Sequence, residues 1–97
     1  MEEEYIIRNY MVDLVSSLLP DYLAEHFDEL GQYSQSLVFT NKLKAMTLNR
    51  IPARYITSKK GEVYSAYAAK SHQYSADIMV ALSISASELL TELKGST

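Results

Sequence analysis

The feature that most constrains this fold is a helical pattern of apolar residues that runs from Glu62 to Lys94 without a Gly or Pro. Large side chains recur in it at three-to-four spacing, with small Ala residues between them, which is typical of an amphipathic helix. The stripe comprises Val63 or Tyr64, Tyr67, Ala68, Tyr74, Ile78, Ala81, Leu82, Ala86, Leu89 and Leu93. A helix of about thirty residues protrudes from so small a domain unless it packs along other helices or against a second chain.

The N-terminal third also has helical periodicity. We expect one amphipathic helix over Glu3–Leu19, because apolar side chains again alternate at three-to-four spacing. Pro20 is expected to kink this helix or to start a new one, since proline suits the first helical position. The pattern continues over Asp21–Leu30, and Gly31 is the expected stop.

The middle of the chain is less regular. Gln32–Phe39 is interpreted as a connecting loop with one hydrophobic anchor at its end. Thr40 or Asn41 is the expected cap of the next helix, and Pro52 ends that helix because the residue before a proline avoids helical angles. The core-facing residues expected in this helix are Leu43, Met46, and Thr47 or Leu48.

After Pro52 the chain is expected to be extended over Arg54–Thr57, which places Tyr55 and Thr57 on one side of the backbone. Ser58–Gly61 is expected to turn. With no internal repeat, residues 1–97 are predicted to be a single all-α domain of about four helices, the last one long.

Composition narrows the function classes. The chain is 47% hydrophobic and 22% charged, which is ordinary for a globular protein, and it has no Cys for a disulfide or thiolate metal site. The acidic start Met1-Glu2-Glu3-Glu4 is unlike a signal peptide, and no apolar run reaches the roughly 20 residues of a membrane span. We therefore expect a cytoplasmic protein without a membrane partner.

Charge is distributed unevenly along the sequence. Residues 1–29 carry a net charge of −7, residues 30–61 carry +6 without a single acid, and the remainder carries −2. One interpretation is that the acidic and basic parts neutralise each other across the fold. The other is an anion-binding site in the basic segment. The net charge of −3 favours a compact anion over a nucleic acid, whose binders are usually basic overall.

Catalytic and metal chemistry have little support. There is no Cys nucleophile and no Gly-x-Ser-x-Gly motif, and His26 and His72 are far apart in sequence, so both are expected to be structural. Ligand-capable side chains cluster from Asp21 to Glu29, but they point in different directions around a helix. A solvated acidic face is the preferred interpretation, and we expect no metal and no cofactor. Tyr64, Tyr67 and Tyr74 are expected to pack in the core or at a dimer interface.

The segment from Asn49 to Lys60 has a different character. It places two guanidinium groups, an aromatic ring, hydroxyls and two ammonium groups across a proline-stiffened helix end. The planar donor fork of Arg suits phosphate and also the O6 and N7 edge of guanine, and Tyr55 could stack on a base. The alternative is that Arg50 and Arg54 pair with the acidic first helices.

Residues 43–61, Leu-Lys-Ala-Met-Thr-Leu-Asn-Arg-Ile-Pro-Ala-Arg-Tyr-Ile-Thr-Ser-Lys-Lys-Gly, resemble the signature of the late competence development protein ComFB family. That signature is a helix ending in Ala-Leu-Asn-Arg-Leu-Pro-Pro-Arg-Tyr, followed by a Thr/Ser-x-Lys-Gly turn. The opening segment Asn9–Val15 also looks like the start of that family. The resemblance extends over roughly residues 5–93. Ala53 replaces the second proline, which leaves the turn less rigid.

The resemblance implies an all-helical, homodimeric, non-catalytic domain of the bacterial cytoplasm that binds cyclic di-GMP or cyclic di-AMP and relays the signal to a partner protein. On this signature the expected ligand-binding residues are Asn49, Arg50, Pro52, Arg54, Tyr55, Thr57, Lys59 and Lys60. Some members hold zinc through cysteines before the signature helix. Residues 31–39 contain no such ligand set, so no zinc is expected here.

Two hypotheses follow from these observations. The first is a cyclic dinucleotide receptor, with cyclic di-GMP favoured because paired arginines read guanine edges and adenine has no O6. A two-fold dimer could present matching residues to both halves of such a two-fold ligand. The second is a ligand-free adaptor of the competence or motility machinery, whose basic segment docks on an acidic protein surface.

Overall fold

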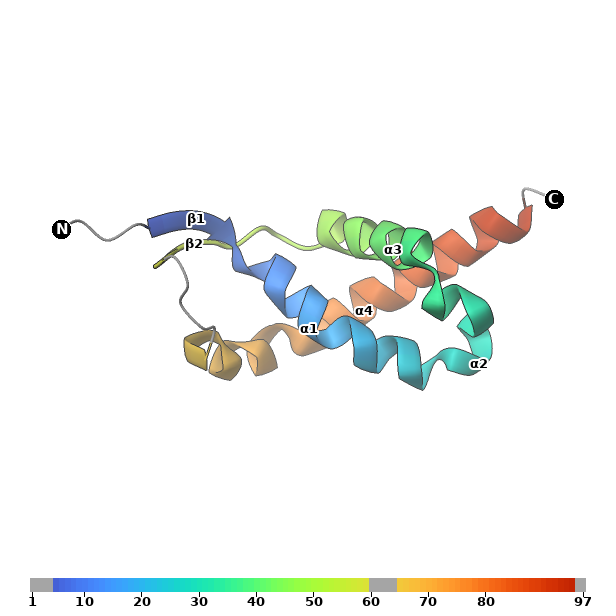
Figure 1. Ribbon diagram of the computed structural model, residues 1–97, viewed down its shortest axis with the longest axis horizontal. Helices are drawn as coiled ribbons and strands as arrows, with labels where there is room; N and C mark the ends of the chain where they lie inside the picture. The colour runs from blue at the N-terminus through green and yellow to red at the C-terminus, as the bar shows by residue number, and fades with distance from the viewer. Residues whose placement is uncertain (1–4, 60–64, 96–97) are drawn as a thin grey trace.

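The computed structural model describes residues 5–59 and 65–95. Its elements are β1 (Tyr5–Asn9), α1 (Tyr10–Glu25), α2 (Phe27–Leu30), the 3-10 helix η1 (Gly31–Gln35), α3 (Leu37–Arg50), β2 (Tyr55–Lys59) and α4 (Ser65–Gly95). The two strands lie at one end of the molecule, and α2 lies toward the other (Figure 1). The longest dimension is 58 Å, because the 31 residues of α4 alone span about 46 Å at 1.5 Å per residue.

The all-α prediction is wrong at the N-terminus. Tyr5–Asn9, which was expected to lie inside a helix starting at Glu3, forms a strand that pairs antiparallel with β2. The register places Tyr5 opposite Lys59 and Asn9 opposite Tyr55. Aromatic and β-branched residues favour a strand, and the strand ends where Asn9 caps α1 by accepting a hydrogen bond from the Met11 amide at 3.1 Å. The domain is therefore mostly helical, with a two-stranded ribbon.

Pro20 does not start a new helix. It lies inside α1, which continues to Glu25. Its side chain is exposed, so water can bond the carbonyl that loses its helical N–H donor. The break comes at His26, whose amide and ring Nδ1 both lie within hydrogen-bond distance of the Tyr22 carbonyl, at 3.1 and 2.9 Å. Gly31 ends α2 with φ of +55°, as predicted.

The predicted loop over Gln32–Phe39 is instead η1 followed by the first turn of α3. Ser36, rather than Thr40 or Asn41, caps α3 by accepting a hydrogen bond from the Phe39 amide at 3.2 Å. Phe39 is the buried anchor of this segment, whereas Leu37 and Val38 are exposed. At its other end α3 stops at Arg50, and Ile51 is extended before Pro52, as predicted.

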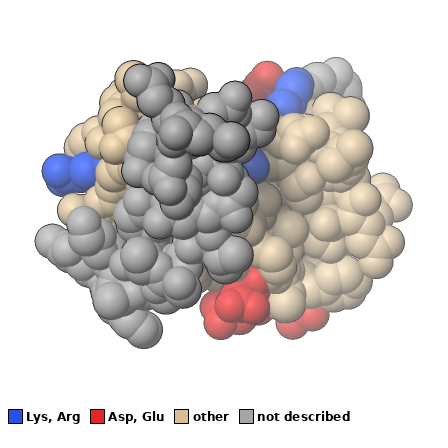
Figure 2. Space-filling view, turned by 60° about the vertical axis from the view of Figure 1, so that its left-hand side comes forward, with Lys and Arg blue, Asp and Glu red and all other residues tan. Residues whose placement is uncertain are grey.

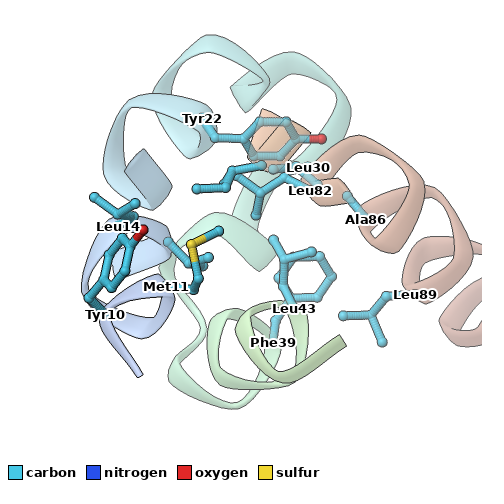
Figure 3. Close-up of a cluster of buried hydrophobic side chains, with 12 residues drawn as sticks. Tyr10, Met11, Leu14, Tyr22, Leu30, Phe39, Leu43, Leu82, Ala86 and Leu89 are labelled. Carbon is cyan, nitrogen blue, oxygen red and sulfur yellow. The ribbon is translucent and has the colours of Figure 1, made fainter. Parts of the chain in front are cut away.

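The core lies where α1 and α3 pack against α4. Side chains from the three long helices and from Leu30 of α2 converge in one cluster (Figure 3). Its members are Tyr10, Met11, Leu14, Val15, Tyr22, Leu30, Phe39, Leu43, Ile78, Leu82, Ala86 and Leu89. The predicted stripe of α4 is confirmed from Tyr74 onward, because Ile78, Leu82 and Leu89 are buried. The earlier stripe positions, Val63, Tyr64, Tyr67 and Ala68, lie outside the described side chains.

Candidate ligand-binding site

The ribbon turns one face to the solvent and one toward the helices. Tyr55 and Thr57 are exposed, together with Ile7, which is directly opposite Thr57. Ile56, on the other face, packs partly buried against the core cluster. This alternation is the one predicted from the sequence. Tyr55 is 69% exposed while its backbone is fixed in the ladder, so its ring can serve as a platform for another planar group.

Arg54 is fixed in place through its backbone. Its amide donates to the Asn9 side-chain Oδ1 at 2.9 Å, and its carbonyl accepts from the Tyr10 amide at 2.9 Å. Asn9 Oδ1 therefore accepts two amide hydrogens, one from the first turn of α1 and one from the signature segment. This double acceptor ties the signature to the start of α1, although 45 residues separate Asn9 from Arg54.

The Arg54 guanidinium lies over the ring of Tyr74 on α4, with Cζ 5.1 Å from the ring centroid. Such a cation–π contact is worth roughly 0.5–1 kcal/mol at an exposed site. The Tyr74 ring lies 6.1 Å from that of Tyr10, measured between centroids. The hydrogen bond between the two hydroxyls, together with burial, raises the pKa of Tyr10, and the charge of Arg54 partly opposes this shift. The Arg54 side chain thus lies on an aromatic pair that joins α1 to α4.

Arg50, at the end of α3, is bound to α4 at another place. Its Nε donates to the Ser85 hydroxyl at 3.1 Å, and its guanidinium forms an ion pair with Glu88. The ion pair is partly exposed, whereas Ser85 is buried. The alternative in which Arg50 pairs with the acidic first helices is therefore wrong. Its carboxylate partner lies on the last helix, and Asp13 of α1 pairs with Arg8 instead.

The two signature arginines do not converge on one point in this protomer. Arg54 contacts α4 at Tyr74, and Arg50 contacts it at Ser85. Eleven residues of helix separate these positions by about 16 Å along the axis. Asn49 and Pro52 are exposed. Lys59 ends β2 but its side chain lies outside the described part, as does all of Lys60.

A shallow cavity of about 360 Å³ adjoins Arg50. Ile51 and Pro52 line it from the signature, and α4 contributes the rest of the lining, Asp77, Val80, Ala81 and Ile84. Val80 and Ile84 are exposed apolar side chains, at 59% and 44%. The signature therefore borders directly on an apolar stretch of α4 that no described residue covers.

Figure 2 turns the ribbon end forward. The described Lys and Arg atoms lie at separate places on this face, and most of the Asp and Glu atoms lie along its lower edge. The described Lys and Arg atoms visible on this face thus do not form one continuous basic surface.

Among residues 5–59 and 65–95 there is no group of three His, Asp or Glu side chains placed to hold a metal ion. His26 stacks on Tyr22, with 4.1 Å between ring centroids, which is the packed structural role expected for it. His72 lies outside the described side chains. No helix in the described part is both long and apolar enough to cross a membrane.

Sequence reasoning missed Asn9, Ser85 and Glu88. Asn9 carried a usable signal, because Asn directly before an amphipathic run is a preferred helix cap. Ser85 falls on the buried stripe of α4, where a hydroxyl needs a partner. Glu88 gave no local signal, since its partner Arg50 lies 38 positions earlier.

These observations define a small, mostly helical domain with an exposed Tyr and two anchored Arg on a strand-forming signature. The chain belongs to the late competence development protein ComFB family, whose model matches residues 8–90. This confirms the family predicted from the signature. No curated protein and no solved structure gave a significant match.

Proposed function

We propose that this ComFB-family protein is a cytoplasmic, non-catalytic receptor for a cyclic dinucleotide, with cyclic di-GMP favoured over cyclic di-AMP. The observation that carries the proposal is the placement of Tyr55. It is a largely exposed aromatic ring, held on a strand and directly preceded by the anchored Arg54. Stacking of a base on such a ring contributes roughly 1–3 kcal/mol.

The polar groups around Tyr55 supply the remaining contacts. Thr57 shares its face of the ribbon and offers a hydroxyl to a phosphate oxygen. Arg54 offers a donor fork that matches phosphate or the guanine O6 and N7 edge. Lys59 and Lys60 follow in the sequence and add positive charge. The proposed binding residues are those of the signature, with Asn49 and Pro52 at its bend.

A second copy of the chain completes the proposed site. A cyclic dinucleotide has two-fold symmetry, so a two-fold dimer presents the same residues to both of its halves. The exposed Val80 and Ile84 beside the Arg50 cavity offer an apolar contact for such a partner. Because the arginines of one protomer contact α4 about 16 Å apart, one phosphate would meet Arg50 from one copy and Arg54 from the other.

Calorimetric titration with cyclic di-GMP and then cyclic di-AMP tests the proposal. Tyr55→Ala should weaken binding about 5- to 150-fold, the equivalent of one lost stack. Tyr55→Phe, which keeps the ring, should bind nearly as tightly as wild type. Arg54→Ala should also weaken binding. Because this change also removes the contact with Tyr74, circular dichroism of the variant checks that its fold is unchanged. Sedimentation with and without ligand measures the dimer.

The adaptor hypothesis is supported by a different observation. Arg50 already has a carboxylate partner, Glu88, and a hydroxyl partner, Ser85, and it therefore needs no ligand to satisfy its charge. In that case the exposed ribbon would bind a protein. Absence of heat with both nucleotides would contradict the receptor proposal and favour the adaptor. Binding that both Tyr55→Ala and Arg54→Ala leave unchanged would place the nucleotide elsewhere.

A further inference from the structure

A second hollow lies on a different side of α4 from the Arg50 cavity. It is a groove of about 460 Å³ between the end of α1, α2 and the C-terminal half of α4. Tyr22, Ala86 and Leu90 form its largely buried, partly apolar floor. Ser83, Ser87 and Thr91, spaced four residues apart, line it from α4. The groove has room for a few side chains of a partner but not for a whole domain.

Several groups in this groove accept hydrogen bonds, beside hydroxyls, which can donate or accept, and the Lys94 ammonium, which donates. The Tyr22 carbonyl can only accept, so the His26 Nδ1 2.9 Å away donates to it, which leaves Nε2 as an acceptor in the neutral ring. Glu29 adds a carboxylate beside it. Thr91 donates its hydroxyl hydrogen to the Ser87 carbonyl at 2.9 Å, which leaves its oxygen with free lone pairs. A bound group that donates hydrogen bonds fits this lining.

The charged residues at the rim of the groove also favour a partner that donates hydrogen bonds, in this case a positively charged one. The sequence has no Lys or Arg from residue 9 to residue 41, and this stretch includes four exposed acids of α1 and α2, of which one lines the groove and three are each next in sequence to a lining residue. They are Asp21, Glu25, Asp28 and Glu29, and none of them forms an ion pair with a described residue. Lys94, near the end of α4, is the one Lys or Arg among the described lining residues. The excess of negative charge favours a cationic partner.

An apolar anchor lies next to these acids. Phe27, the first residue of α2, is 51% exposed although it directly follows His26 of the groove. Aromatic residues are enriched at protein interfaces, so an exposed Phe next in sequence to a lining residue and to Asp28 offers an apolar contact to a partner.

We propose that this groove docks a basic, apolar-anchored segment of a partner protein. An apolar side chain of that segment occupies the floor over Tyr22 and Leu90, and its Lys or Arg side chains meet the acidic rim. The groove lies away from the ribbon and from the signature segment. This proposal is therefore independent of the dinucleotide proposal and would survive its failure.

Selection of a random peptide phage library on the immobilised full-length chain tests the docking proposal. Enriched peptides should combine Lys or Arg with Leu or Phe, and their affinity should fall at high salt. Ser87→Trp, which fills the groove from an exposed position, should weaken the best peptide roughly tenfold or more, as expected for a blocked central pocket. Ala45→Trp, at an exposed position of α3, is the matched control and should change nothing.

A second variant protects the test against a folding defect in Ser87→Trp. Asp28→Asn with Glu29→Gln removes two exposed rim charges and should weaken the same peptide several-fold, mostly at low salt. The proposal would be overturned if the enriched peptides were acidic or if no peptide were enriched. It would also be overturned if both groove variants bound the peptide as tightly as wild type. A self-association of the chain that Ser87→Trp abolishes would also overturn it, because the occupant would then be a second copy.

Discussion

The helical core and the ribbon differ sharply in what they bury. Leu43, Ile78 and Leu82 have no exposed surface, so each contributes fully to the free energy of unfolding through burial. In the ribbon, Ile7 and Tyr55 are 76% and 69% exposed, and mainly Ile56 packs inward. A two-stranded ribbon is marginal by itself in water. The comparison teaches that the helices stabilise the fold, while the ribbon presents a surface.

The largest expected effect is in the core. Leu82→Ala should lower the free energy of unfolding by about 2–5 kcal/mol, because it leaves a cavity among close-packed helices. Ile7→Ala in the ribbon should change it by less than about 0.5 kcal/mol. Urea unfolding followed by circular dichroism measures both. Equal losses from the two variants would break the distinction between core and ribbon.

An intermediate effect is expected where the two regions join. Asn9→Ala removes the acceptor shared by the Met11 and Arg54 amides and should destabilise the protein by about 0.5–2 kcal/mol, the usual cost of a lost cap. Asn41→Ala, at an exposed position of α3, is the control and should be nearly neutral. Thermal unfolding of the two variants gives the difference. If Asn9→Ala were as neutral as its control, the acceptor shared by the two amides would contribute nothing to the free energy of unfolding.

A smaller effect is expected at the Arg50 ion pair. Glu88→Gln should cost less than about 1 kcal/mol, since both partners are partly exposed. Under the receptor proposal the same change should tighten dinucleotide binding, because Glu88 no longer competes with phosphate for Arg50. Glu25→Gln on α1 is the control for a general loss of negative charge. Unfolding and calorimetry on the same samples would show whether Arg50 serves the core or the binding surface; unchanged affinity would assign it to the core.

The smallest effect appears only at alkaline pH. Burial raises the pKa of Tyr22 above its ordinary value of 10.0, and a hydrogen bond with Ser83 partly opposes this. The folded state therefore holds the phenol proton more tightly than the unfolded state, so stability should fall as the pH rises above 10. Tyr22→Phe should lose less stability over that interval than wild type. Parallel slopes in unfolding experiments would contradict this assignment.

Local signals predicted much of the helical framework. Gly31 and Pro52 ended their helices as expected, and the stripe through Ile78, Leu82 and Leu89 located the buried face of α4. Their effects act within one or two helical turns, so a single sequence shows them. The start of α3 was misplaced, because Ser36 competed successfully with two other capping residues.

The ribbon and much of the site depended on contacts between distant residues. β1 forms because Tyr5–Asn9 meets a strand some fifty residues later, and nothing within the segment names that strand. The exposure of Tyr55 follows from the predicted alternation of the extended segment, and Tyr55 directly follows the anchored Arg54. The partners that separate the two arginines, Tyr74 and Glu88, could not be inferred, since periodicity gives the face of a helix but not what lies across from it.

The shared acceptor Asn9 has a consequence for the motions of the molecule. The first turn of α1 and the Arg54 amide depend on one carbonyl oxygen. When the ribbon detaches, that oxygen loses one of its two donors and the helix start loses its restraint. We therefore expect the amides of Met11 and Arg54 to exchange with deuterium at similar rates, as one cooperative opening unit, and faster than amides at the centre of α4.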